Sequence, residues 1–240
     1  MSKHRIDKHL VSLTSPGSFA AEQYQGLRLT LERLRRAHSA QVIAVTSPGA
    51  GEGKTLTAIN LAAALARGSD ARVLLVDADL RRPAVARQLG IVDADAPGLA
   101  DLIARPDLAI GQVAHTIEPF NLSVIRAGSV KTSVHHVLRS PRLDEILKDA
   151  RARFDFIVVD TPPLLPVFDS ALVSRTVDGV LVVIAANQTP RKLLGEALNL
   201  LDASKVLGIV FNRDARPLFG YYDSYYREYF PDTSGLASRA

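Results

Sequence analysis

The segment at residues 46–55 constrains this chain more than any other. It reads Thr-Ser-Pro-Gly-Ala-Gly-Glu-Gly-Lys-Thr, follows an apolar run at 42–45 and precedes the apolar stretch 56–65. This order predicts a strand, a glycine-rich turn and a helix. In such a turn the glycines let successive backbone N–H groups face a phosphate chain, and the helix N-terminus adds partial positive charge. The segment therefore predicts a nucleotide-binding P-loop.

Two side chains of this loop have predicted roles. Lys54 is expected to reach the β- and γ-phosphates, and the Thr55 hydroxyl is expected to bind Mg²⁺. Pro48 departs from the P-loop pattern, which has glycine at this position, five residues before Gly53. An ordinary glycine-rich turn is the alternative, but the Gly-Lys-Thr sequence at the start of a helix, after a buried strand, argues against it. The residues predicted to bind ATP are Gly49, Ala50, Gly51, Glu52, Gly53, Lys54, Thr55, Leu56 and Asn212.

Two further apolar runs end in aspartate. One is followed by Asp77 and Asp79, and the other by Asp160. Because ligands of open α/β sheets bind at the carboxyl ends of parallel strands, we expect these carboxylates to meet at one site. Each segment alone could be a solvated strand end, but that reading does not explain all three elements together. The predicted catalytic residues are Lys54, Asp77 and Asp79, and the predicted metal ligands are Thr55, Asp79 and Asp160, the last through water.

In the rest of the chain, apolar runs of strand length alternate with helical segments. This order predicts an α/β fold, with a doubly wound, mostly parallel sheet flanked by helices. Helices are expected at about 19–37 and 190–203, and strands at 179–186 and 206–211. Asn212 ends the last strand, where it can bond the adenine edge or serve as a plain turn residue. Residues 1–18 are expected to form a flexible arm, 19–213 the P-loop domain and 214–240 a flexible tyrosine-rich tail.

Composition narrows the class of protein. The 240 residues are 47% apolar and suit one α/β domain, and the longest apolar runs have strand length. No cysteine is present, which favours a cytoplasmic location and excludes a thiolate metal site. The net charge of +4 permits contact with acidic lipid, but we interpret it as a solvated surface and expect no nucleic-acid partner. His135 and His136 lack further ligands at metal-binding spacing, so we expect them on a loop or helix surface.

The C-terminal segment is unusually rich in tyrosine. It holds five of the six tyrosines of the chain. Several are four residues apart, so an aromatic stripe on a helix is one interpretation. Proline and glycine residues flank the segment, and aliphatic residues are nearly absent from it. This composition favours a mobile tail rich in hydroxyl groups. The tyrosines are Tyr221, Tyr222, Tyr225, Tyr226 and Tyr229.

Together these motifs resemble the cytoplasmic catalytic domain of the bacterial tyrosine kinases that regulate capsule and exopolysaccharide export. Residues 47–55 resemble the family's Walker A motif, 75–83 its second acidic motif and 157–163 its Walker B motif. The resemblance runs from about residue 14 to 230. It implies a P-loop fold unrelated to eukaryotic-type kinases, with ATP and Mg²⁺ as cofactors. It also implies phosphorylation of the terminal tyrosines, with a neighbouring subunit as the source of the tail.

The resemblance also carries expectations about partners. The family's early helix holds a Glu-x-x-Arg-x-x-Arg motif for ring assembly, which Glu22 and Arg28 match while Gln25 replaces the middle arginine. Oligomerisation through Glu22 and Arg28 is therefore an expectation that the substitution weakens. Many members of the family are fused to a membrane domain, and we expect none in this chain. The resemblance thus implies a separate membrane activator, a polysaccharide chain-length-determinant or co-polymerase protein, which recruits the kinase to the inner face of the membrane.

Two other classes of protein remain as alternatives. A positioning ATPase of the partition and division-site type shares the fold, but carries a second lysine where this chain has Gly49. A non-catalytic, nucleotide-dependent scaffold is the other alternative, and the intact Lys54, Asp77, Asp79 and Asp160 argue against it. In the favoured mechanism Asp77 is the candidate base for an incoming tyrosine, while positioning and charge neutralisation outweigh base strength.

Overall fold

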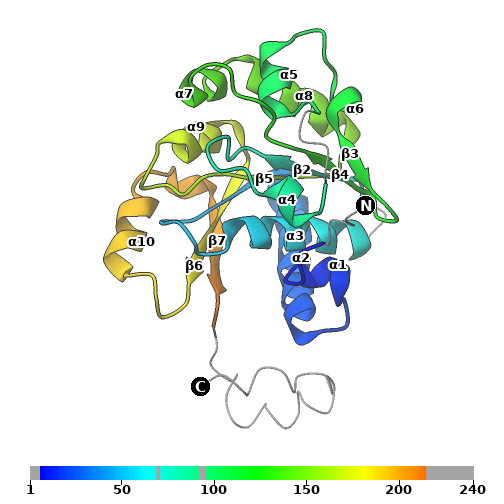
Figure 1. Cartoon of the computed structure of the whole chain (residues 1–240). Helices are drawn as coiled ribbons and strands as arrows, with labels where there is room; N and C mark the ends of the chain where they lie inside the picture. The colour runs from blue at the N-terminus through cyan, green and yellow to red at the C-terminus, as the bar shows by residue number, and fades with distance from the viewer. Residues whose placement is uncertain (1–5, 69–70, 92–95, 215–240) are drawn as a thin grey trace, which may run out of the picture.

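A seven-stranded sheet forms the centre of the molecule, with helices on both faces (Figure 1). The structure, a computed structural model, describes residues 6–68, 71–91 and 96–214. The strand order is β3-β4-β2-β5-β1-β6-β7, and every neighbouring pair is parallel except β3 and β4. The strands are β1 Val42–Thr46, β2 Val73–Asp77, β3 His115–Ile117, β4 Leu122–Ile125, β5 Phe156–Asp160, β6 Gly179–Ala185 and β7 Val206–Asn212. The predicted α/β class with a mostly parallel sheet is confirmed.

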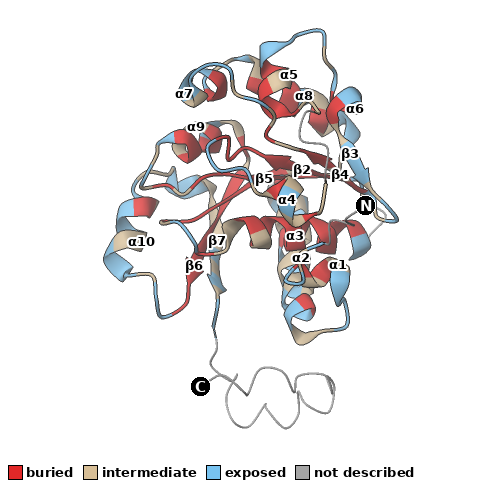
Figure 2. Ribbon diagram, viewed as in Figure 1, coloured by how far each residue is buried: buried red, intermediate tan, exposed pale blue. Residues whose placement is uncertain are grey.

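The central strands are buried on both faces, as Figure 2 shows. Their sequences are runs of Val, Ile and Leu because a sheet covered by helices on both sides has no polar face. Alternate residues enter two separate cores. In β1, for example, Val42 and Ala44 join one core, while Ile43 and Val45 join the other.

Helices α1 (Val11–Thr14), α2 (Phe19–His38) and α3 (Lys54–Gly68) cover one face. Helix α2 begins where its sequence predicts, since the Ser18 hydroxyl accepts a hydrogen bond from the N–H of Ala21 at 3.2 Å. Helix α3 is almost wholly buried between α2 and the sheet, which explains its many alanines. Its position fixes the P-loop against the core.

The other face carries most of the remaining helices. The helices on this face are α5 Leu99–Ala104, α6 Ile110–Val113, α7 Val134–Leu138, α8 Arg142–Arg153 and α9 Asp169–Thr176. Helix α10 (Arg191–Leu198) packs Leu194 and Leu198 against the same core, whereas α4 (Val85–Gln88) packs on the α3 side. The helix expected to reach residue 203 ends at Leu198, and a 3-10 turn, η1 (Ala203–Lys205), precedes β7. Strand β3, which the sequence did not predict, adds an antiparallel edge.

The N-terminal segment differs from the expected flexible arm in its described part, residues 6–18. Leu10 is fully buried against α2 and α3. The side-chain oxygen of Asn60 on α3 accepts from the N–H of Ser12 at 2.9 Å, and its amide nitrogen donates to the carbonyl of His9 at 3.0 Å. This segment is therefore part of the packed domain, because one apolar side chain and one buried amide hold it on the P-loop helix.

Three other expectations can be compared with the described ranges. His135 and His136 lie on α7 and are exposed, as predicted. Among the described residues, no three or more His, Cys, Asp or Glu side chains are grouped so that they could hold a metal ion by themselves. In the same ranges no helix has the length and apolar character needed to cross a membrane. The tail tyrosines at 221–229 lie outside the described residues.

Candidate active site

The P-loop connects β1 at the centre of the sheet to the first turn of α3. Gly51 and Gly53 have φ angles of +82° and +93°, which side chains other than glycine rarely adopt. A Cβ on Gly53 would also lie 2.0 Å from the Asn212 side-chain nitrogen. The helix begins at Lys54, so the Gly-Lys-Thr sequence occupies the expected place at a helix N-terminus.

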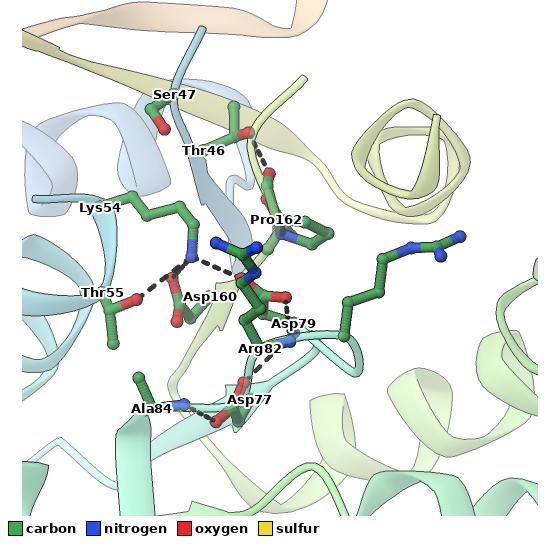
Figure 3. A network of polar contacts seen from close by, with 12 residues as sticks. Thr46, Ser47, Lys54, Thr55, Asp77, Asp79, Arg82, Ala84, Asp160 and Pro162 are labelled. Carbon is green, nitrogen blue, oxygen red and sulfur yellow. Dashed lines mark hydrogen bonds and ion pairs between the residues drawn. The ribbon is translucent and has the colours of Figure 1, made fainter. Parts of the chain in front are cut away.

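The predicted charged residues meet beside this loop (Figure 3). Strands β2 and β5 are parallel neighbours that align Asp77 with Asp160. The Lys54 ammonium lies 2.8 Å from Asp79 Oδ2 and 3.6 Å from Asp160 Oδ1. The same ammonium lies 3.2 Å from the Thr55 hydroxyl oxygen. The structure therefore brings together all five residues predicted to act in catalysis or metal binding.

Asp160 is the least satisfied member of this cluster. Its side chain is fully buried, and within the described ranges neither carboxylate oxygen accepts a hydrogen bond of ordinary geometry. Burial raises the pKa of Asp160 to about 6, which the charge of Lys54 and the nearby Thr55 hydroxyl partly oppose. A buried carboxylate without donors is costly unless a cation accompanies it. Asp160 and Thr55 thus form a donor set that fits a hard divalent cation.

Asp77 is also fully buried, but its oxygens are occupied. Oδ2 accepts from the N–H groups of Ala84 and Val85 at 3.1 Å each, and Oδ1 accepts from the N–H of Asp79 at 3.2 Å. Burial, followed by the charge of Asp160, raises the pKa of Asp77 to about 7. Asp77 thus holds the loop after β2 in place. Its assignment as a base stays a prediction, since its visible contacts are all to backbone amides.

The two arginines after Asp79 separate in the structure. Arg81 donates through Nε and Nη2 to both carboxylate oxygens of Asp169, a buried residue in the first turn of α9. The backbone N–H of Arg82 donates to Asp79 Oδ1 at 3.0 Å. The Arg81 guanidinium is thus held in an ion pair with Asp169. Its partner was not predicted, and the only signal for Asp169 was an acid near a helix start.

The ends of β1 and β5 are joined by side-chain hydroxyls. The hydroxyl of Thr46 donates to the carbonyl of Pro162 at 2.9 Å, and the Ser170 hydroxyl donates to the same carbonyl. The Thr161 hydroxyl donates back to the carbonyl of Val45 at 3.1 Å. These contacts hold the loop after Asp160 against the strand that leads into the P-loop.

Asn212 lies at the carboxyl end of β7 and contacts the P-loop directly. Its side-chain nitrogen donates to the carbonyl of Glu52 at 2.8 Å. The Glu52 carboxylate in turn accepts from the Thr189 hydroxyl at 2.9 Å, a contact that the sequence did not indicate. Binding of the adenine edge by Asn212 stays a prediction. Its contact with the loop places it on the nucleotide side of the sheet.

The residues predicted for oligomerisation, Glu22 and Arg28, lie on α2 and are not part of this cluster. Glu22 is exposed. Arg28 donates to Gln25 Oε1 at 2.9 Å, to Glu32 Oε1 at 2.8 Å and to the carbonyl of Gly68 at 3.1 Å. It lines an open pocket of about 610 Å³. The guanidinium of Arg28 is thus engaged within its own chain, and Gln25, the residue that departs from the family motif, supplies one of its acceptors.

The fold and the loop define the chain as a nucleotide-binding P-loop protein. Comparison of the sequence with known families agrees, since residues 40–204 match the AAA domain family. The division-site ATPase MinD of Pyrococcus furiosus has a similar structure, with a TM-score of 0.60 and 26% identity over 79% of this chain and 80% of that one.

Named relatives define the family more closely. The tyrosine-protein kinase YwqD of Bacillus subtilis is 29% identical over 91% of this chain and 92% of its own length. The tyrosine-protein kinase CpsD of Streptococcus pneumoniae is 30% identical over 85% of this chain and 92% of its own. The putative tyrosine-protein kinase EpsB of Ralstonia nicotianae is 31% identical over 95% of this chain, which spans only 30% of that longer protein.

A solved kinase domain agrees with these sequences. The kinase domain of the Escherichia coli tyrosine kinase ETK has a TM-score of 0.79 and 27% identity over 88% of this chain and 83% of that one. The chain therefore belongs to the bacterial tyrosine-protein kinases. The family and the enzyme class predicted from the sequence are confirmed.

Proposed function

We propose that this chain transfers the γ-phosphoryl group of ATP to the tyrosines of its own C-terminal tail, between subunits. The cluster of Lys54, Asp79 and Asp160 beside the P-loop carries this proposal. It joins a cation that suits phosphate to buried carboxylates that suit Mg²⁺. The acceptors are Tyr221, Tyr222, Tyr225, Tyr226 and Tyr229.

In the proposed site Thr55 and Asp160 would hold Mg²⁺, and Asp79 would support the metal. When bound, Mg²⁺ neutralises charge on the phosphates. In this structure the Lys54 ammonium pairs with Asp79 at 2.8 Å. To contact the phosphates of ATP, the ammonium would have to give up part of this ion pair. The P-loop amides and the N-terminus of α3 hold the phosphate chain. Asn212 is the proposed contact to adenine.

The acceptor tyrosine needs orientation more than activation. A phenol with a pKa near 10 is mostly protonated at neutral pH. Phosphoryl transfer through a loose transition state depends little on the strength of the base. Asp77 is the proposed base, and its hydrogen bonds to the N–H groups of Ala84 and Val85 fix its position. We therefore propose that Asp77, held by the loop after β2, contributes more by orienting the tyrosine than by accepting its proton.

Phosphorylation changes the charge of the tail strongly. Each phosphate adds roughly −1.5 to −2 charge, so five phosphates would give a strongly negative segment. A site lined by Asp77, Asp79 and Asp160 repels such a segment, although Lys54 and Mg²⁺ weaken the repulsion. We therefore propose that phosphorylation ends docking of the tail and loosens any oligomer.

The proposed pathway is polysaccharide export. The succinoglycan biosynthesis transport protein ExoP of Rhizobium meliloti is 31% identical over 90% of this chain, which spans 28% of that protein. We propose that this kinase regulates polymerisation and export of a capsule or exopolysaccharide. Its activator would be a membrane chain-length-determinant protein whose cytoplasmic segment docks on the kinase and recruits it to the inner face of the membrane.

A positioning ATPase is the second candidate, because MinD shares the fold. A lysine at position 49 is the feature that separates that class, and this chain has glycine there. A Cβ can be accommodated at this position, since on Gly49 it would lie 3.6 Å from Glu52 Oε1, an ordinary contact distance. The glycine is therefore not required by crowding at this position, and the missing lysine favours the kinase.

Mixing two defective variants tests the proposal. Lys54→Met keeps the tail and lacks the phosphate-binding lysine, and a variant with all five tail tyrosines changed to phenylalanine keeps the site. With MgATP and the cognate activator segment, we expect phosphotyrosine on the tail of Lys54→Met only when the second variant is present. Hydrolysis of ATP by wild type without phosphotyrosine would instead favour the positioning ATPase.

A further inference from the structure

The side chain of Glu52 is turned into the protein, although this residue belongs to a loop that binds phosphate. It is 7% exposed, and its Oε1 accepts a hydrogen bond from the Thr189 hydroxyl at 2.9 Å. Thr189 lies just beyond β6, and its hydroxyl oxygen accepts from the N–H of Ala185, the last residue of that strand, at 3.0 Å. The carboxylate is thereby attached to the carboxyl end of β6.

The backbone of the same residue is attached to the next strand. The carbonyl of Glu52 accepts from the Asn212 side chain at 2.8 Å, and Asn212 is the last residue of β7. Strands β6 and β7 are parallel neighbours, with Ala185 opposite Asn212. Residue 52 is therefore attached to two adjacent strand ends, one through its side chain and one through its backbone.

The start of the loop has backbone attachments of its own, since the N–H groups of Leu164 and Leu165 donate to the carbonyls of Ser47 and Pro48 at 2.8 and 3.3 Å. Gly51 and Gly53 both have positive φ, and glycines give a loop many conformations to lose on ligand binding. The Ser47 hydroxyl donates to the carbonyl of Gly49 at 2.7 Å, and the N–H of Gly49 faces the Glu52 carboxylate. The Glu52 side chain thus adds a contact to the first half of the loop, where Pro48 replaces the usual glycine.

Burial of the Glu52 carboxylate lowers the free energy of unfolding. Burial raises the pKa of Glu52, although the Thr189 hydroxyl and the Gly49 N–H oppose the shift. Among the described residues, Oε2 has no hydrogen-bond partner. A buried carboxylate with an unsatisfied oxygen lowers stability. Its presence in a ligand-binding loop therefore points to a contribution to binding rather than to folding.

We propose that Glu52 is a positioning residue that locks the P-loop to the ends of β6 and β7, so that nucleotide binds to a loop already ordered. This inference rests on the proposed nucleotide site. A preordered loop loses less conformational entropy when ligand binds, which raises affinity. Thr189 is the partner through which Glu52 acts.

Calorimetric titration with MgADP tests the coupling without depending on catalysis. Thr189→Val removes the hydroxyl at nearly constant volume, and Glu52→Ala removes its acceptor. We expect each to weaken binding about tenfold, which equals about 1.4 kcal/mol. Thr189→Ser keeps the hydroxyl that donates to Glu52 Oε1 and should bind MgADP within about twofold of wild type. Thr176→Val removes a hydroxyl bonded to the carbonyl of Val173, away from the P-loop, and is the matched control.

The double variant Glu52→Ala/Thr189→Val gives the decisive comparison. If the two groups act through one contact, it should bind MgADP no more weakly than either single variant. In the kinase assay, KM for ATP should rise by the same factor while kcat changes little. Unchanged affinity in the single variants, or separate losses that multiply to about a hundredfold, would overturn the proposal.

Melting temperatures distinguish a purely structural role. If the variants melt at lower temperature but bind MgADP as wild type does, Glu52 acts only in folding and the proposal is wrong. If wild type itself fails to bind MgADP, the proposed function is refuted first, and this inference with it. Binding by wild type with weakened binding only in the Ala and Val variants supports the proposal.

Discussion

Asp160→Asn should stabilise the metal-free protein while it abolishes function. Asp160 is fully buried and its pKa is raised from 3.8 to about 6. A shift of about two pKa units costs the folded state about 3 kcal/mol at pH 8. Asparagine removes the charge, but leaves a buried amide that needs its own partners. We therefore expect the variant to gain about 1 to 3 kcal/mol in free energy of unfolding at pH 8.

The raised pKa of Asp160 determines how the stability of the wild type should change with pH. Between pH 3.8 and about 6 the folded state holds the Asp160 proton more tightly than the unfolded state does. Stability of the wild type therefore falls as pH rises through this window, and remains lower above it. The asparagine variant has no such proton to lose, so its advantage should be greatest at pH 8. At pH 4.5 the advantage should fall to roughly one third.

Urea denaturation with EDTA at pH 4.5 and 8 provides the measurement. Asp149→Asn changes an aspartate on α8 that is 43% exposed, and serves as the control that should show little effect. Added MgADP should raise the melting temperature of wild type but not of Asp160→Asn. An Asp160→Asn protein that is no more stable than wild type at pH 8, or whose gain is the same at both pH values, would refute the argument.

Three other substitutions test separate parts of the structure. Leu10→Ala should lower the free energy of unfolding in urea by about 2 to 5 kcal/mol, because Leu10 is fully buried, whereas Ile6→Ala should cost less than about 1 kcal/mol. Gly53→Ala should abolish MgADP binding in calorimetry, because its φ is +93° and the added Cβ meets Asn212. Gln25→Arg removes an acceptor of Arg28 and restores the family motif, so light scattering should show a larger oligomer.

Each of these predictions has an outcome that contradicts it. Equal stability of Leu10→Ala and wild type would mean that residues 6–18 do not belong to the packed domain. Binding of MgADP by Gly53→Ala at wild-type affinity would show that the loop tolerates another conformation. An unchanged mass for Gln25→Arg, with Glu22→Ala as the comparison, would separate Arg28 from oligomerisation.

The central part of the site could be predicted because it follows from topology. Parallel strands that end in aspartate place their carboxylates at one edge of the sheet, so Asp77 and Asp160 had to lie near the loop after β1. The glycines and Lys54 are consecutive in sequence, and their spacing alone defines the turn. The class of fold followed from the same pattern, since buried strands alternated with helices.

Other contacts depend on how distant segments pack, which no local pattern encodes. Arg81 meets Asp169, 88 residues later in the chain, and Glu52 meets Thr189, 137 residues later. The N-terminal segment was expected to be an arm because its sequence has no regular period, yet it is held by Asn60, 48 residues after Ser12. Such pairings are set by tertiary structure, and single polar residues give little warning of them.

Intact-mass spectrometry of the purified protein with MgATP and its activator segment tests the central claim most directly. The account predicts stepwise addition of phosphate to wild type, mapped by peptide analysis to residues 221–229, and none to Lys54→Met treated in the same way. Hydrolysis of ATP by wild type without any addition of phosphate to tyrosine would contradict the account.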